Sequence, residues 1–174
     1  MEENKNQVEE NWLQKHLDDF ASEVTGQLKG IENLEMLILK SHLLAEYYLN
    51  DLVLINFQYS YKKLSDPYYG FKRKIDDLRS KKIFDDWEYR SLSVLNSIRN
   101  NMSHTLHYSI GKSDIDNLGQ IIHNQNNFDY VLIKNKSKDN KELLINILVR
   151  IIVIPHKKIA NYLSDKNDSL KSKT

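Results

Sequence analysis

The stretch "ENLEMLILKSHLLAEYYLNDLVLINF", residues 32–57, decides the fold that we expect for this chain. Its apolar side chains recur at helical spacing and cover a wide face, as in the most buried helix of a bundle. A second stretch with a helical apolar stripe, residues 7–24, precedes it, and Gly26 and Gly30 mark the break between the two. The sequence therefore predicts two consecutive long helices with a short connection.

The composition favours long helices joined by few turns. The chain has 174 residues, of which 40% are hydrophobic, and it contains only 5 Gly and 2 Pro. Glycine and proline are the residues that tight turns require, so their scarcity disfavours a sandwich or a small barrel. The length suits one domain. We expect a single helical domain over residues 1–164 and a flexible polar tail over residues 165–174.

Four further helices are predicted downstream, over residues 67–81, 86–101, 114–123 and 141–163. Ser65 or Asp66 is suited to cap the first of them, with Pro67 in its first turn. Residues 128–141 suit a brief extended piece, and Pro155 is expected to kink or divide the last helix. The predicted fold class is all-α: a mainly antiparallel bundle of about five to six helices, with at most one short extended segment.

The charge distribution leaves two interpretations open. The formal net charge is only +1, which excludes a uniformly basic surface for nucleic acid. Basic side chains nevertheless gather between residues 62 and 82, where eight Lys or Arg face three Asp. This segment is either a solvated helix face or a basic rim that attracts an anionic partner, with Lys72, Arg73 and Lys74 as candidate RNA-binding residues.

Nothing in the sequence indicates a membrane protein. The most apolar run, residues 143–155, contains Asn146 and Arg150 and is shorter than the roughly 18 apolar residues of a membrane span. The N-terminal stretch is acidic and polar, unlike a signal peptide. The chain has no Cys, which excludes disulfides and cysteine-based zinc sites. We expect a soluble, cytoplasmic protein without a membrane partner.

The stretch "SIRNNMSH", residues 97–104, carries the main candidate site. Arg99 and His104 are five residues apart, so an unbroken helix would point them roughly 140° away from each other. If the helix ended near Asn101, the asparagines would let the chain turn and bring His104 back towards Arg99. Arginine binds phosphate and histidine exchanges protons near neutral pH, which suits metal-independent RNA cleavage by the ribose 2′-OH. A two-fold homodimer would bring two such pairs into one cleft.

The same residues resemble a known family. The segment "LSVLNSIRNNMSH", residues 92–104, is similar to the R-x4-6-H motif of HEPN domains, and "SHLLAEYYLNDLV", residues 41–53, resembles their long core helix. Residues 70–104 look particularly like the branch related to the mannitol repressor, and the resemblance covers about residues 30–125. It implies a helical bundle that forms homodimers with juxtaposed motifs. It also implies a metal-independent endoribonuclease of toxin–antitoxin, abortive-infection or antiviral systems, with RNA as substrate and an antitoxin or defence protein as a possible partner.

Carried over by residue, the resemblance implies that Arg99 and His104 are catalytic and that Asn100 fills the polar position after the arginine. A toxin branch of the family has the pattern His-x-Tyr, whereas this chain has His104-Thr-Leu-His107-Tyr108. Roles for His107 and Tyr108 therefore stay open. Some relatives are not nucleases, so a non-catalytic bundle that binds a partner protein or regulates transcription is the alternative function.

Three further residues are candidate supporting groups. His42 and Glu46 are four apart and share a helix face, so Glu46 either pairs with His42 on a metal or orients Arg99. One such pair without a third ligand is too little for a metal site, and we expect no metal and no cofactor. Ser103 is either a site residue or a local hydrogen-bond donor to the backbone. The aromatic residues between positions 57 and 71 either stack on unpaired bases or pack, and we favour packing.

Overall fold

The computed structural model describes residues 2–125 and 128–171. Within these ranges the chain forms eight helices and no strand: α1 (Glu2–Lys29), α2 (Leu34–Phe57), α3 (Tyr61–Leu64), α4 (Phe71–Ser80), α5 (Asp86–His104), α6 (Lys112–Ile122), α7 (Tyr130–Lys136) and α8 (Asn140–Lys171). The predicted all-α bundle is confirmed, with more helices than the five to six expected. The additional helices are the short α3 and α7.

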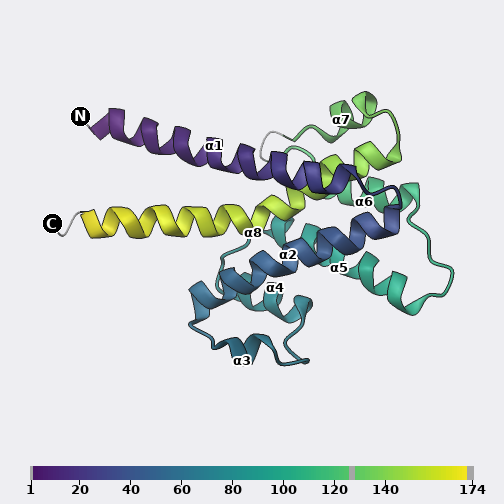
Figure 1. The fold of residues 1–174 in the computed structure, drawn as a ribbon, viewed down its shortest axis with the longest axis horizontal. Helices are drawn as coiled ribbons and strands as arrows, with labels where there is room; N and C mark the ends of the chain where they lie inside the picture. The colour runs from purple at the N-terminus through teal and green to yellow at the C-terminus, as the bar shows by residue number, and fades with distance from the viewer. Residues whose placement is uncertain (1, 126–127, 172–174) are drawn as a thin grey trace.

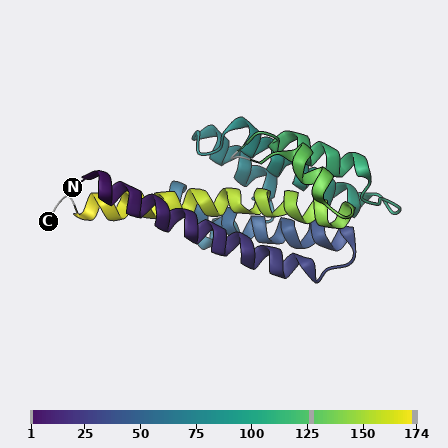
Figure 2. The same ribbon diagram turned by 90° about the horizontal axis from the view of Figure 1, so that it is seen from above.

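The bundle is organised around α8. Figure 2 shows α4, α5, α6 and α7 on one side of this helix and α1 and α2 on the other. The two terminal helices, α1 and α8, run antiparallel and extend beyond the body, so both ends of the chain lie at the same end of the molecule (Figure 1). The core is continuous across these layers, because fully buried side chains come from α2, α4, α5, α6 and α8 alike.

Side chains cap the N-termini of two central helices, α2 and α5. The side chain of Asn33 caps α2 by accepting the backbone N–H of Met36 at 2.8 Å. Asp85 caps α5 in a capping box with Glu88, whose carboxylate accepts the backbone N–H of Asp85 at 2.8 Å. These caps fix where the two helices that carry the candidate site begin.

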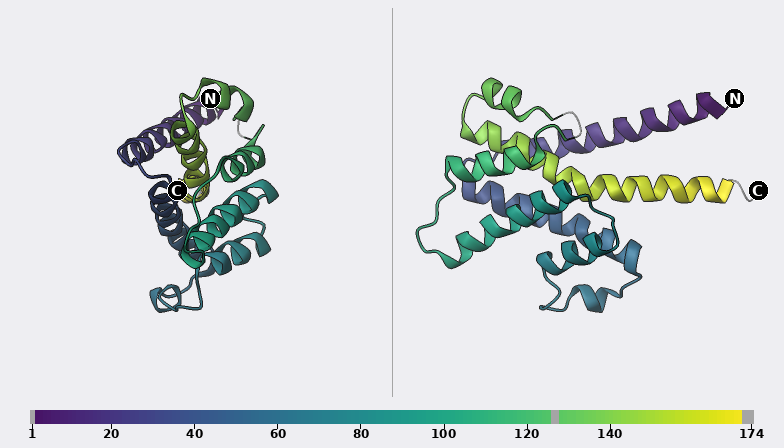
Figure 3. Two further views of the ribbon diagram at one scale, coloured as in Figure 1. Left: turned by 90° about the vertical axis from the view of Figure 1, so that its right-hand side faces the viewer. Right: turned by 180° about the vertical axis from the view of Figure 1, so that it is seen from behind.

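The start of α4 differs from the prediction. The helix begins at Phe71, because Asp66 closes a turn instead of capping a helix. Its carboxylate accepts the backbone N–H of Tyr68 at 2.9 Å, and its carbonyl oxygen accepts that of Tyr69 at 2.9 Å. Pro67 therefore lies in this turn and not in the first turn of α4. Figure 3 shows α3 and α4 at the edge of the body opposite α1 and α7.

The C-terminal third also differs in detail. The expected extended piece is the helix α7, which Asp129 caps by accepting the backbone N–H of Leu132 at 3.0 Å. Pro155 lies inside α8 without dividing it. The backbone of residues 165–171 continues that helix, whereas residues 172–174 of the predicted tail lie outside the described residues. None of the helices described here combines the length and the hydrophobicity needed to cross a membrane.

Candidate functional site

The helix that carries Arg99 and His104 is unbroken, so the expected end near Asn101 is wrong. α5 continues to His104, the hydroxyl of Ser103 donates to the carbonyl of Arg99 at 3.1 Å, and the N–H of Thr105 donates to the carbonyl of Asn101 at 2.9 Å. Asn101 is not among the residues with positive φ. An α-helix turns about 100° per residue, so Arg99 and His104 point roughly 140° apart on one chain.

Arg99 lines an open cleft between α2, α5 and the start of α4. The cleft has a volume of about 640 Å³. Its wall comprises side chains from all three helices and the turn before α4, including His42, Glu46, Tyr68, Arg73, Asn96 and Arg99. Asn100 also lines it, whereas His104 is exposed at the end of α5 and is not part of the lining. The structure thus places Arg99 and Asn100 in the cleft and His104 outside it.

The charge of Arg99 is not neutralised by a carboxylate within the described part of the chain. Its Nη1 atom donates to the side-chain oxygen of Asn100 at 3.2 Å. Glu46, which was expected to orient Arg99, instead forms an ion pair with Lys74 at 2.7 Å. Glu46 therefore holds α2 to α4, and the guanidinium of Arg99 keeps its positive charge for an anionic ligand.

The histidine beside Arg99 in the cleft is His42, which the sequence suggested, together with Glu46, as either a metal ligand or a support for Arg99. Its Nε2 atom lies 3.0 Å from the side-chain oxygen of Asn96, and its ring stacks on Phe71 with centroids 4.2 Å apart. Burial lowers the pKa of His42, so the ring is neutral at pH 7. Asn96 precedes Arg99 by three residues, and this helical spacing was the available signal that both share one face of α5.

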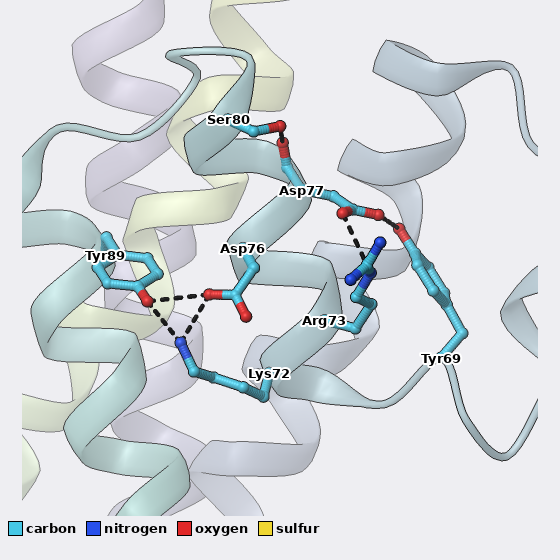
Figure 4. Close-up of polar contacts among 7 residues, drawn as sticks. All are labelled: Tyr69, Lys72, Arg73, Asp76, Asp77, Ser80 and Tyr89. Atoms are coloured by element: carbon cyan, nitrogen blue, oxygen red, sulfur yellow. Dashed lines mark hydrogen bonds and ion pairs between the residues drawn. The ribbon is translucent and has the colours of Figure 1, made fainter.

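The basic residues of α4 are mostly paired. Figure 4 shows the ammonium of Lys72 between Asp76 and Tyr89, and the guanidinium of Arg73 on Asp77. The two ion pairs measure 2.6 and 3.3 Å. Lys72 and Arg73 keep exposed side chains at the cleft, 52% and 66% respectively. The expectation for Lys74 is wrong, because its side chain is only 4% exposed and cannot reach a large ligand.

The remaining candidate residues lie outside the cleft lining. The hydroxyl of Tyr108 donates to Asp114 at 2.8 Å, and burial raises the pKa of this tyrosine, so it anchors the loop between α5 and α6 in its protonated form. His107 is exposed in that loop. Ser103 bonds to the backbone of its own helix, which favours the local of its two expected roles.

The aromatic segment divides into packed and exposed members. Phe57, Tyr59 and Tyr69 form a chain of ring contacts with centroid distances of 5.1 and 5.8 Å. Phe71 and Tyr69 are buried. The favoured prediction, packing, is confirmed for these rings, whereas Tyr68 is 93% exposed.

A second cavity of about 390 Å³ lies between α1, α5 and α8, and none of the predicted site residues lines it. No group of three or more His, Asp or Glu side chains in the described ranges is placed to share a metal ion. Comparison of the chain with protein-family models, with curated protein sequences and with solved structures finds no match. The Arg99 cleft is therefore the basis for assigning a function.

Proposed function

We propose that this protein is a metal-independent endoribonuclease of the HEPN type that acts as a homodimer. The observation that carries the proposal is Arg99, a cation without a carboxylate partner in the described residues, in an open cleft of about 640 Å³. A guanidinium in such a position binds a phosphodiester through two parallel hydrogen bonds. We place the activity in a toxin–antitoxin, abortive-infection or antiviral role.

The proposed reaction uses a nucleophile from the RNA itself. The ribose 2′-oxygen attacks the adjacent phosphorus while a base removes the proton of the 2′-OH. The bond from phosphorus to the 5′-oxygen breaks, and an acid protonates the leaving 5′-oxygen. Arg99 stabilises the charge that develops on the phosphorane, and His104 transfers protons. The products are a 2′,3′-cyclic phosphate and a 5′-OH, and no divalent cation is required.

In this proposal, a second copy of the chain brings a His104 side chain close to Arg99. On one α5 helix Arg99 and His104 diverge, so we propose that the arginine of one chain works with the histidine of the other. The exposed face of α2 suits such a contact: Met36, Leu43 and Tyr47 recur at intervals of seven and four residues and are 52%, 63% and 62% exposed. His42 and Glu46 directly precede Leu43 and Tyr47 and line the cleft, so a partner on this face would lie next to the cleft.

The test is cleavage of fluorescent RNA in EDTA by the wild type and by Arg99→Ala and His104→Ala variants. We expect both variants to lose at least about a hundredfold in rate, since each removes a charge or proton contact to the reacting group. Arg90→Ala is the matched control, because Arg90 is an exposed arginine of the same helix, nine residues earlier. Activity that survives in both site variants would reject the assignment.

Mixing the two inactive variants tests the shared site. A heterodimer of Arg99→Ala and His104→Ala chains contains one composite site with both groups intact. Recovery of part of the activity after mixing and re-equilibration is expected for a site shared between chains. Cleavage by each wild-type chain as a monomer, without recovery on mixing, would contradict the two-chain site.

The alternative function is a non-catalytic bundle that binds a partner protein or regulates transcription. The unbroken course of α5, which separates Arg99 from His104, favours it. Expression in cells distinguishes the two functions: growth inhibition that disappears with His104→Ala supports the nuclease. Equal growth with the wild type and the variant, together with no RNA cleavage in EDTA, supports the binding module.

A further inference from the structure

We propose that Tyr68 is a stacking platform for an unpaired nucleobase, which makes single-stranded RNA the ligand of the Arg99 cleft. The inference rests on the proposed function for the identity of the ligand as RNA. It adds a specificity residue that the Arg99–His104 chemistry does not include.

The aromatic ring of Tyr68 is exposed to solvent at the cleft. It is 93% exposed, yet it lines the same cleft as Arg99. The neighbouring Tyr69 is only 2% exposed and provides the packing contact of this turn. Packing therefore explains Tyr69 and does not explain Tyr68.

The backbone that carries Tyr68 is fixed. Asp66 accepts the N–H groups of Tyr68 and Tyr69 in the turn described above, each at 2.9 Å. On the C-terminal side of Tyr68, the hydroxyl of Tyr69 donates to Asp77 at 3.0 Å, which ties the turn to α4 (Figure 4). A ring held on an ordered turn loses little conformational entropy when a base stacks on it.

A cation lines the same cleft as the ring of Tyr68. The same Asp77 that anchors Tyr69 also pairs with Arg73 at 3.3 Å, and the side chain of Arg73 is 66% exposed and lines the cleft (Figure 4). A groove that combines an exposed aromatic ring with cations for the backbone phosphates is the arrangement by which proteins bind single strands. In a duplex the faces of the bases are already stacked, so the ring selects unpaired RNA.

The test is fluorescence anisotropy with the full chain carrying His104→Ala, which prevents cleavage, and with a single-stranded RNA and a blunt RNA duplex of the same sequence. We expect Tyr68→Ala to weaken single-strand binding about tenfold and Tyr68→Phe to retain it, because stacking needs the ring and not the hydroxyl. Tyr162→Ala is the matched control, since Tyr162 is an exposed tyrosine of α8 outside the cleft.

The outcomes separate this inference from the nuclease proposal. Unchanged binding by Tyr68→Ala, or tighter binding of the duplex than of the single strand, would overturn the role of Tyr68 even if the wild type cleaves RNA. Single-strand binding that depends on Tyr68 in a protein that never cleaves would support the platform and reject the nuclease. Absence of RNA binding at any accessible concentration would overturn both.

Discussion

The Nε2 atoms of His16 and His156 lie 3.2 Å apart and join the two long terminal helices. At this distance one ring donates its N–H and the other accepts with a bare nitrogen, so at least one nitrogen must stay unprotonated. Trp12 stacks on His16 and Phe20 stacks on His156, with centroid distances of 5.4 and 3.8 Å. The contact between α1 and α8 therefore depends on the protonation state of this pair.

Acid should weaken the fold through His156. Burial, helped by the neighbouring His16 and opposed by Glu23, lowers the pKa of His156 to about 4. The unfolded chain, with a pKa near 6.5, binds more protons between these values, so this stability is present above pH 6.5 and is lost as the pH falls towards 4. Because the ring is partly exposed, we expect a loss of about 1 kcal/mol between pH 7.5 and 5, measured by urea unfolding.

A His156→Gln variant should lose the part of the pH dependence that comes from His156 and keep the part from His42, whose pKa burial also lowers, whereas His107→Gln, which changes an exposed histidine, should keep all of it. Equal pH dependence in the wild type and in His156→Gln would show that other groups cause the effect.

The ion pair between Glu46 and Lys74 should respond unequally to the loss of either partner. The side chain of Lys74 is 4% exposed and that of Glu46 is 29% exposed, so only the carboxylate reaches water without its partner. Glu46→Ala leaves a buried ammonium unpaired and should cost about 2–3 kcal/mol, whereas Lys74→Met should cost less than about 1 kcal/mol. Urea unfolding of both variants checks this order, and equal losses would contradict it.

Gly119 is the position where an added methyl group should be least tolerated. A Cβ atom there would lie 2.1 Å from Cε2 of Tyr130, a ring that is 1% exposed. The ring cannot retreat, because its hydroxyl donates to Asp116, which also pairs with Lys134. Gly119→Ala should therefore destabilise the protein by about 2–3 kcal/mol in urea unfolding.

Gly26 provides the matched control for that substitution. It lies inside α1 and not at the break predicted there, and no atom beyond its chain neighbours and the local helix backbone lies within 4 Å of the Cβ position. Gly26→Ala should stabilise the protein by about 0.5–1 kcal/mol, since alanine loses less backbone entropy in a helix. A destabilisation of similar size in both variants would show that the Tyr130 contact is not the cause.

The exposed face of α2 should determine the oligomeric state. Multi-angle light scattering at micromolar concentration is expected to give a dimer for the wild type and a monomer for the Leu43→Lys/Tyr47→Lys double variant, because two ammonium groups cannot be buried in an apolar contact. Leu106→Lys, at a 92% exposed position in the loop after α5, should remain a dimer. A wild-type monomer under these conditions would remove the two-chain site.

Periodicity and capping predicted the parts of the fold that depend on neighbouring residues. The apolar face of the second helix and the helix start at residue 86 are local patterns, and the structure confirms them. The end of α5 was misjudged because asparagine preferences are small compared with continued helical hydrogen bonding. The start of α4 was misjudged because an aspartate that caps a helix and one that closes a turn look alike in sequence.

Contacts between segments that are distant in the sequence determine which residues line the cleft. The bond between His42 and Asn96 joins residues 54 positions apart, and the pairing of Glu46 with Lys74 joins residues 28 apart. Periodicity shows which side chains share a face of one helix, but it does not show which helix that face meets. Arg99 could be singled out from its motif, whereas its neighbours in the cleft could not.

The continuity of α5 gives the spacing of its motif a consequence for assembly. If the two side chains were four positions apart, as i and i+4, an unbroken helix would place them about 40° apart and a single chain could present both to one phosphate. With five, as for Arg99 and His104, the angle opens to about 140°, and the helix offers no hinge to close it. For the proposed chemistry, the spacing of five positions on an unbroken helix thus makes dimer formation a condition of activity. Dilution, which dissociates dimers, would therefore abolish the activity.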